Sequence, residues 1–172
     1  ALAAGIHASS SELGRQLDLW NMEPMGLLGI ALADAHRGRV EPARRSAEAA
    51  SARARSIGDM DSLAGSEYVL GLLALSLGDA ATAHRHLEPA VALIRSLGEA
   101  DSACLLALAN EIEALAALGE QSHAEALLLE LEEHADRLDR ARPLALAARS
   151  RAIVEADRGN LAAALASIDR AL

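Results

Sequence analysis

The chain has 172 residues, 52% of them apolar, and a net charge of −9, and every basic residue is an arginine. The acidic balance argues against binding to a nucleic acid backbone, which depends on positive charge, and the lack of lysine excludes a Walker A phosphate loop. A single cysteine, Cys104, excludes an internal disulfide and a cysteine-rich zinc site.

Two features of the sequence bear on location. Residues 1–10 lack the basic start of a signal peptide, and the longest nearly apolar stretch, 68–77, is too short to span a bilayer. We therefore expect a cytoplasmic protein without a membrane segment. The chain begins without Met and ends inside a helical pattern, which predicts a segment of a longer protein.

Four glycines divide the sequence into repeats. Gly38, Gly78, Gly119 and Gly159 are 40, 41 and 40 residues apart, and each lies between two helical patterns, where a helix commonly ends. The residues five, nine and twelve positions after each glycine are mostly Ala and Leu, and these steps of four and three trace one face of a helix. The residue seven positions before each glycine is small in three of the four repeats, which predicts close packing within a helix pair.

A second recurring motif marks the turn between one helix pair and the next. Residues 56–62 reappear as residues 96–102, and residues 137–140 occupy the same place in the third pair without the glycine. In chain order, the pattern predicts helices at about 1–18, 22–37, 40–57, 60–77, 80–97, 101–118, 121–138, 142–158 and 161–172. Asp79, Asn160, Ser62 and Ser102 are candidate N-caps, and Pro89 predicts a bend or a lost backbone bond inside its helix.

The predicted fold is therefore an all-α superhelix of about four helix pairs, each 40–41 residues long, preceded by a lone helix. We expect a single domain over residues 1–172, with repeats at 22–58, 60–98, 101–139 and 142–172. The small residue, the turn glycine and the Ala-large-Ala face resemble the tetratricopeptide repeat, although its usual period is 34 residues. Repeats of this greater length that are rich in Ala, Leu and Arg resemble the helical region of large LuxR-family regulators similar to the maltose-regulon activator. The stretches 77–83 and 158–165 carry this resemblance.

This resemblance implies a function for the segment. In that group the repeats sense an inducer or a partner protein, between an ATPase module and a helix-turn-helix domain that lie outside these residues. We therefore expect a sensor or scaffold segment that does not itself contact DNA. A free-standing adaptor for protein–protein assembly is the alternative. We also expect exposed Ala and Leu surfaces at both ends of the array to favour self-association.

In this architecture the first helix of each pair lines a concave groove. When the groove positions of the tetratricopeptide repeat are transferred to this sequence, the following residues are expected in the groove: Met25, Leu28, Leu32 and His36 from the first pair, Tyr68, Leu72 and Ser76 from the second, Asn110 and Glu113 from the third, and Arg149, Ile153 and Asp157 from the fourth. The groove is expected to be apolar at one end and polar at the other. The alternative is that its apolar members only pack between repeats.

Other candidate residues favour structural roles. His84 and His86 point in opposite directions on one helix and cannot share a metal ion, so we expect both to be solvated. Trp20 is expected to pack between the first two helices, and Cys104 to be a small buried residue. We predict that the chain is not an enzyme and has no catalytic, cofactor-binding or metal-binding residues, because no nucleophile–base pair or ligand cluster stands out in the sequence.

Overall fold

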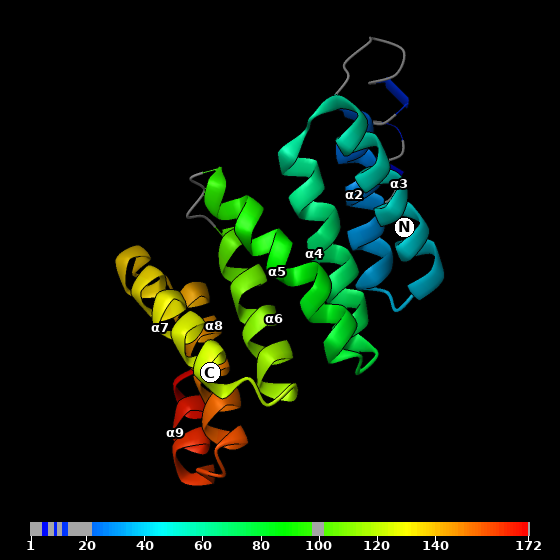
Figure 1. Ribbon diagram of the computed structural model, residues 1–172. Helices are drawn as coiled ribbons and strands as arrows, with labels where there is room; N and C mark the ends of the chain where they lie inside the picture. Colours follow the sequence, from blue (N-terminus) through cyan, green and yellow to red (C-terminus); the bar gives the residue numbers. More distant parts are fainter. Residues whose placement is uncertain (1–4, 7–8, 10–11, 14–21, 98–101, 172) are drawn as a thin grey trace.

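The computed structural model describes residues 5–6, 9, 12–13, 22–97 and 102–171, and it is helical throughout the longer ranges (Figure 1). The helices are α2 (Met22–Ala35), α3 (Val40–Ile57), α4 (Met60–Ser76), α5 (Ala80–Ser96), α6 (Ser102–Ala117), α7 (Gln121–Leu138), α8 (Ala141–Asp157) and α9 (Leu161–Ala171). The predicted all-α repeat fold is confirmed. Most of the helix expected over residues 1–18, together with Trp20, lies outside the described residues.

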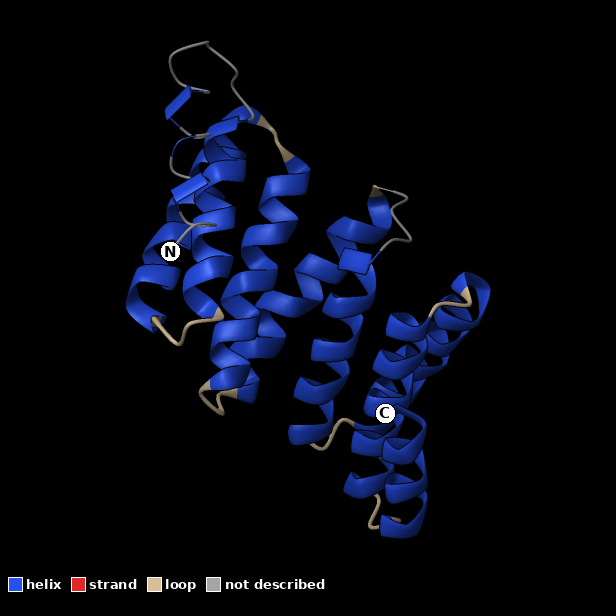
Figure 2. Ribbon diagram, turned by 180° about the vertical axis from the view of Figure 1, so that it is seen from behind, coloured by secondary structure: helices blue, strands red, loops and turns tan. Residues whose placement is uncertain are grey.

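The helices form two layers (Figures 1 and 2). Each helix packs against its neighbours in sequence, and α2, α4, α6 and α8 also contact one another in succession. Within the described part of the chain, α3, α5, α7 and α9 make no such contacts with one another. The first helices of successive pairs thus contact one another, whereas the described second helices do not. The stack therefore curves toward the layer of first helices, which becomes the inner, concave side.

Residues with positive φ end the helices at the turns. Gly78 has φ +77°, and the chain leaves α4 through the bonds from Gly78 N to Leu75 O and from Asp79 N to Ala74 O, both 3.0 Å long. This left-handed conformation is the one that glycine adopts without steric cost. Asp139 takes the equivalent conformation, with φ +46°, at the inter-repeat turn where the sequence lacks the glycine.

Small residues set the distance within each helix pair. Gly71 on α4 is buried against α5, and a Cβ at this position would lie 2.5 Å from Leu87 Cγ and 3.3 Å from Ala83 O. The alanines five positions after the turn glycines are all buried, and they are Ala43, Ala83, Ala124 and Ala164. The alternation of small residues therefore brings the backbones close enough for a core without Phe.

The helix starts agree with the sequence in part. Asp79 accepts a bond from Thr82 N at 3.0 Å, as expected of an N-cap. The prediction for Ser62 is wrong, because Asp59 is the N-cap of α4 and Ser62 N donates to it at 3.1 Å. Helix α5 continues through Pro89. The side chain of Ser102, like that of Cys104, lies outside the described set.

Candidate functional site

An apolar cavity of about 350 Å³ opens between the inner helices of the first three pairs. The side chains come from α2, α4, the end of α5 and α6, and most of them are aliphatic. They are Leu28, Leu32, His36, Asp61, Ala64, Gly65, Tyr68, Ile94, Leu97 and Leu106. Its size and apolar lining are typical of a small-molecule site, and its few polar groups are able to orient a ligand.

Tyr68 is one of the residues that line this cavity. Its half-buried ring packs against three hydrophobic clusters of the described residues. Burial raises the pKa of the Tyr68 phenol, while a hydrogen bond with the Asn110 side chain and the positive charge of Arg142 offset part of that shift. Tyr68 therefore stays a neutral phenol that joins α4 to α6 and borders the cavity.

The structure brings together part of the predicted groove. Leu28, Leu32, His36 and Tyr68 all line the cavity. Met25 and Ser76 are exposed and Leu72 is half-buried, and the three do not line it. The cavity thus corresponds to the predicted apolar end of the groove.

The predicted polar end is bridged by internal contacts. Arg149 on α8 forms an ion pair with Glu113 on α6, and Asp157 accepts a hydrogen bond of 3.0 Å from Gln121. Asn110 is buried beside Tyr68, and Ile153 is half-buried. These residues brace one repeat against the next and do not gather around an open site.

Sequence reasoning missed six cavity residues: Asp61, Ala64, Gly65, Ile94, Leu97 and Leu106. Ile94 continues the buried face of α5, Leu97 is the C-cap of that helix, and both reach the inner side of the array. They do so where α4 and α6 touch least among the inner helices, so the end of α5 is exposed to the concave side. No residue pattern signals this gap, which depends on how the helices tilt.

The expectation that His84 and His86 are solvated is wrong. His86 Nδ1 lies 2.8 Å from Glu67 Oε2 on α4, and His84 Nδ1 lies 2.5 Å from Glu111 Oε1 on α6. The two rings do point apart, but each one faces a buried carboxylate on a different inner helix. Helix α5 is thus linked to both neighbouring inner helices by a His–Glu pair.

Glu111 is the more strongly perturbed member of these pairs. Its side chain is 2% exposed, and burial raises its pKa to about 7, while the hydrogen bond and charge of His84 act in the opposite direction. Glu88 adds repulsion that raises the pKa further. Glu111 therefore changes charge near neutral pH in the middle of the array.

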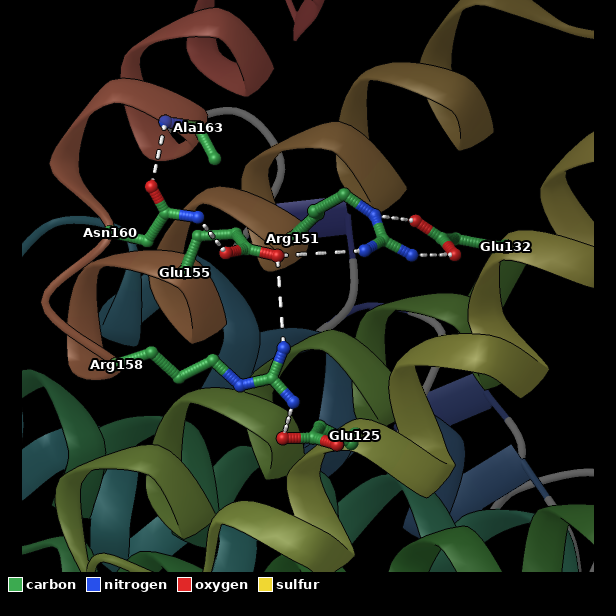
Figure 3. Close-up of polar contacts among 7 residues, drawn as sticks. All are labelled: Glu125, Glu132, Arg151, Glu155, Arg158, Asn160 and Ala163. Atoms are coloured by element: carbon green, nitrogen blue, oxygen red, sulfur yellow. Dashed lines mark hydrogen bonds and ion pairs between the residues drawn. The ribbon is translucent and has the colours of Figure 1, made fainter.

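An ion network joins α7 to α8 and to the turn that follows α8 (Figure 3). Arg151 on α8 pairs with Glu132 on α7 and lies 3.8 Å from Glu155. Arg158 pairs with Glu125 on α7 and also approaches Glu155 at 3.8 Å. Both arginines are therefore neutralised by carboxylates of the protein itself.

Among the described residues, no group of three or more His, Cys, Asp or Glu side chains converges as a metal site would require. None of the described helices combines the length and apolarity needed to cross a membrane.

Comparison with known proteins identifies the fold. No family model matches the sequence, and no curated protein matches it either. A similar solved structure is that of BtubC (BKLC) from P. vanneervenii, with a TM-score of 0.75 and 20% sequence identity. The match covers 98% of this chain and 70% of that chain. At this identity the likeness shows a shared helical fold alone.

Proposed function

We propose that this chain is a ligand-binding repeat segment whose concave apolar cavity binds a small, largely apolar molecule. The observation that carries the proposal is the cavity of about 350 Å³ between α2, α4, α5 and α6, with Tyr68 and His36 among its few polar groups. Aliphatic walls supply the driving force for binding, because they remove apolar ligand surface from water. The phenol of Tyr68 and the imidazole of His36 add directional contacts at the edge.

The position of the cavity links binding to the shape of the array. Its walls come from three successive repeats, since Leu28 lies on α2, Tyr68 on α4 and Leu106 on α6. A ligand would therefore contact both α2 and α6, which, in the described part of the chain, do not contact each other directly. A ligand that binds one arrangement of these helices better than another shifts the population toward it. This is the property that a sensor segment needs.

We further propose that the parent protein is a LuxR-type regulator, in which this segment relays an inducer to ATPase and DNA-binding domains. The support is the resemblance of the 40–41-residue repeats, which are rich in Ala, Leu and Arg. The sequence of the complete gene tests it. A Walker A motif before the repeats and a helix-turn-helix after them are expected, and a gene without either contradicts the regulator role in favour of a free-standing adaptor.

The binding proposal is tested with 8-anilino-1-naphthalenesulfonate, whose fluorescence rises in an apolar site. We expect saturable binding to the wild-type chain and its loss in Leu32→Trp, which fills the cavity. Leu129→Trp on α7 is the matched control, because Leu129 is 64% exposed and lies outside the cavity. Equal binding to both variants would show that the probe binds elsewhere, and circular dichroism verifies that each variant is folded.

A further inference from the structure

The arginines are unevenly distributed along the chain. Residues 37–55, which cover α3 and the turn before it, hold six of the 16 arginines and only two of the 25 acidic residues. The rest of the chain is therefore strongly acidic. Such a concentration of positive charge on one outer helix attracts acidic groups that the remaining surface repels.

This basic helix forms one wall of a second cavity, the outer cleft. The outer cleft lies between α3 and α5, has α4 as its floor, and encloses about 490 Å³. Arg44, Glu48, Ser51 and Arg55 line it, and their spacing of four, three and four residues places them on one face of α3. The cleft exists because α3 and α5 do not contact each other.

The outer cleft is lined by three arginines, Arg44, Arg55 and Arg85, and by three carboxylates, Glu48, Glu67 and Asp79, but among the described residues not every arginine has a carboxylate at hydrogen-bond distance. Glu67, on the floor, accepts bonds from Arg55 at 2.7 Å and approaches His86 at 2.8 Å. Arg44 has its nearest carboxylate, that of Glu41, at 3.7 Å. Within the described residues, the buried Nε of Arg44 has no hydrogen-bond partner. Glu67 thus gives Arg55 and His86, on the two walls, a hydrogen-bond partner, while Arg44 retains donors.

The opposite wall adds a further donor. Arg85 on α5 directs its guanidinium to the hydroxyl of Thr82 at 2.8 Å. It also lies close enough to Asp79 to lower the pKa of that carboxyl, after the two hydrogen bonds from Thr82 that lower it more. Arg44 and Arg85 therefore face the cleft from two helices with donor capacity left over.

Ser51 supplies an independent indication of a ligand. It is only 3% exposed and lines the outer cleft, yet among the described residues its hydroxyl has no hydrogen-bond partner. A buried hydroxyl without a partner is unfavourable, because it has lost its hydrogen bonds to water. An acceptor bound in the cleft would satisfy it.

The equivalent cleft at the other end of the array provides a contrast. There Arg151 and Arg158 are each paired with carboxylates from α7 and α8 (Figure 3). The cavity of about 460 Å³ beside α9 is therefore lined by an arginine, Arg151, that is already paired with carboxylates of α7 and α8. In the outer cleft, by contrast, Arg44 and Arg85 keep donors that have no carboxylate of the described residues at hydrogen-bond distance.

We propose that the outer cleft binds carboxylate side chains of an acidic segment of a partner protein. Arg44, Ser51 and Arg85 donate to these carboxylates, and guanidinium groups match carboxylate geometry well. Glu48 and Asp79 also line the cleft and would repel a uniform polyanion such as a nucleic acid. A peptide avoids this repulsion, because it spaces its carboxylates and offers backbone N–H groups to those two acids.

Fluorescence anisotropy at low ionic strength tests this proposal. The probe is a short fluorescein-labelled peptide of alternating Glu and Ser, the comparison peptide has Gln in place of Glu, and labelled oligo-dT is the polyanion. We expect the Glu peptide to bind best, and Arg44→Ala, Arg85→Ala and Ser51→Ala each to weaken it by about tenfold. Arg137→Ala, which removes an exposed arginine of α7, is expected to change affinity less than twofold.

Three results would overturn the proposal: no binding of the Glu peptide, tighter binding of oligo-dT than of the peptide, or equal losses in Arg44→Ala and Arg137→Ala. Ser51→Ala removes one unpartnered oxygen and is expected to leave the fold intact, so it keeps the test valid if an arginine variant unfolds. Since the outer cleft and the concave cavity share no lining residue, either binding proposal stands or fails without the other.

Discussion

Replacing Gly71 with alanine tests the packing that sets the distance between α4 and α5. The added Cβ would lie 2.5 Å from Leu87 Cγ, 2.8 Å from Leu87 Cδ2 and 3.3 Å from Ala83 O. Leu87 is fully buried, and the Ala83 oxygen belongs to the backbone of α5, so neither has room to move. The two helices must therefore separate.

Two opposing effects determine how much Gly71→Ala changes the free energy of unfolding. Overpacking a tight core costs about 1–3 kcal/mol, and the constrained neighbours place this site in the upper half of that range. Alanine in place of glycine inside a helix contributes about 1 kcal/mol in the opposite direction. We expect Gly71→Ala to lower the free energy of unfolding by about 1–2 kcal/mol, which for a chain of this size lowers Tm by about 2–8 °C.

Gly65→Ala is the matched control on the same helix. Its Cβ would meet only the side chain of Leu28, whose far end is half-buried beside the concave cavity and is free to turn. The helix-propensity gain then dominates, and we expect stability to be unchanged or raised by less than about 1 kcal/mol. Urea denaturation followed by circular dichroism measures both variants. A Gly71→Ala protein as stable as Gly65→Ala would refute the close approach of α4 and α5.

Three further predictions follow from individual residues. Because burial raises the pKa of Glu111 from 4.5 to about 7, the native state holds its proton more tightly; stability should therefore fall by about 3 kcal/mol as pH rises from about 4.5 to 7. Glu111→Gln should abolish this loss and Glu133→Gln should keep it, as denaturation at several pH values will measure. Asp139→Gly should raise Tm, because glycine adopts the positive φ at less cost, whereas Asp136→Gly inside α7 should lower it. Leu165, 68% exposed on the last helix, should promote self-association, so Leu165→Glu should yield a smaller particle by light scattering; an unchanged mass would contradict this.

The repeat could be predicted from sequence because its signals are local. Gly78 needs a left-handed conformation, and Ala83 must fit beneath the neighbouring helix, so both requirements appear as residue types at fixed spacing. The inter-repeat turn that lacks a glycine agrees with this pattern, since Asp139 adopts the positive φ of a glycine at the expected position. Local geometry and residue size were sufficient for these elements.

The pairings across repeats could not be predicted in the same way. His84 and His86 reach carboxylates 27 and 19 residues away in the sequence. The tilt of α5 decides which of its faces turns toward α4 and which toward α6. A histidine on a solvent-exposed face and a histidine that faces a neighbouring helix cannot be distinguished in the sequence pattern. The same tilt brings Ile94 to the concave side and completes the cavity.

Methyl NMR tests the central claim, that the concave cavity is the binding site, most directly. With Leu and Ile methyl groups labelled and 8-anilino-1-naphthalenesulfonate as the probe, we expect the largest shifts at Leu28, Leu32 and Leu106, which line the cavity. Leu129 and Leu165, which are exposed elsewhere, should stay unchanged. Shifts confined to Leu129 or Leu165, or no saturable shift at the cavity methyl groups, would contradict the account.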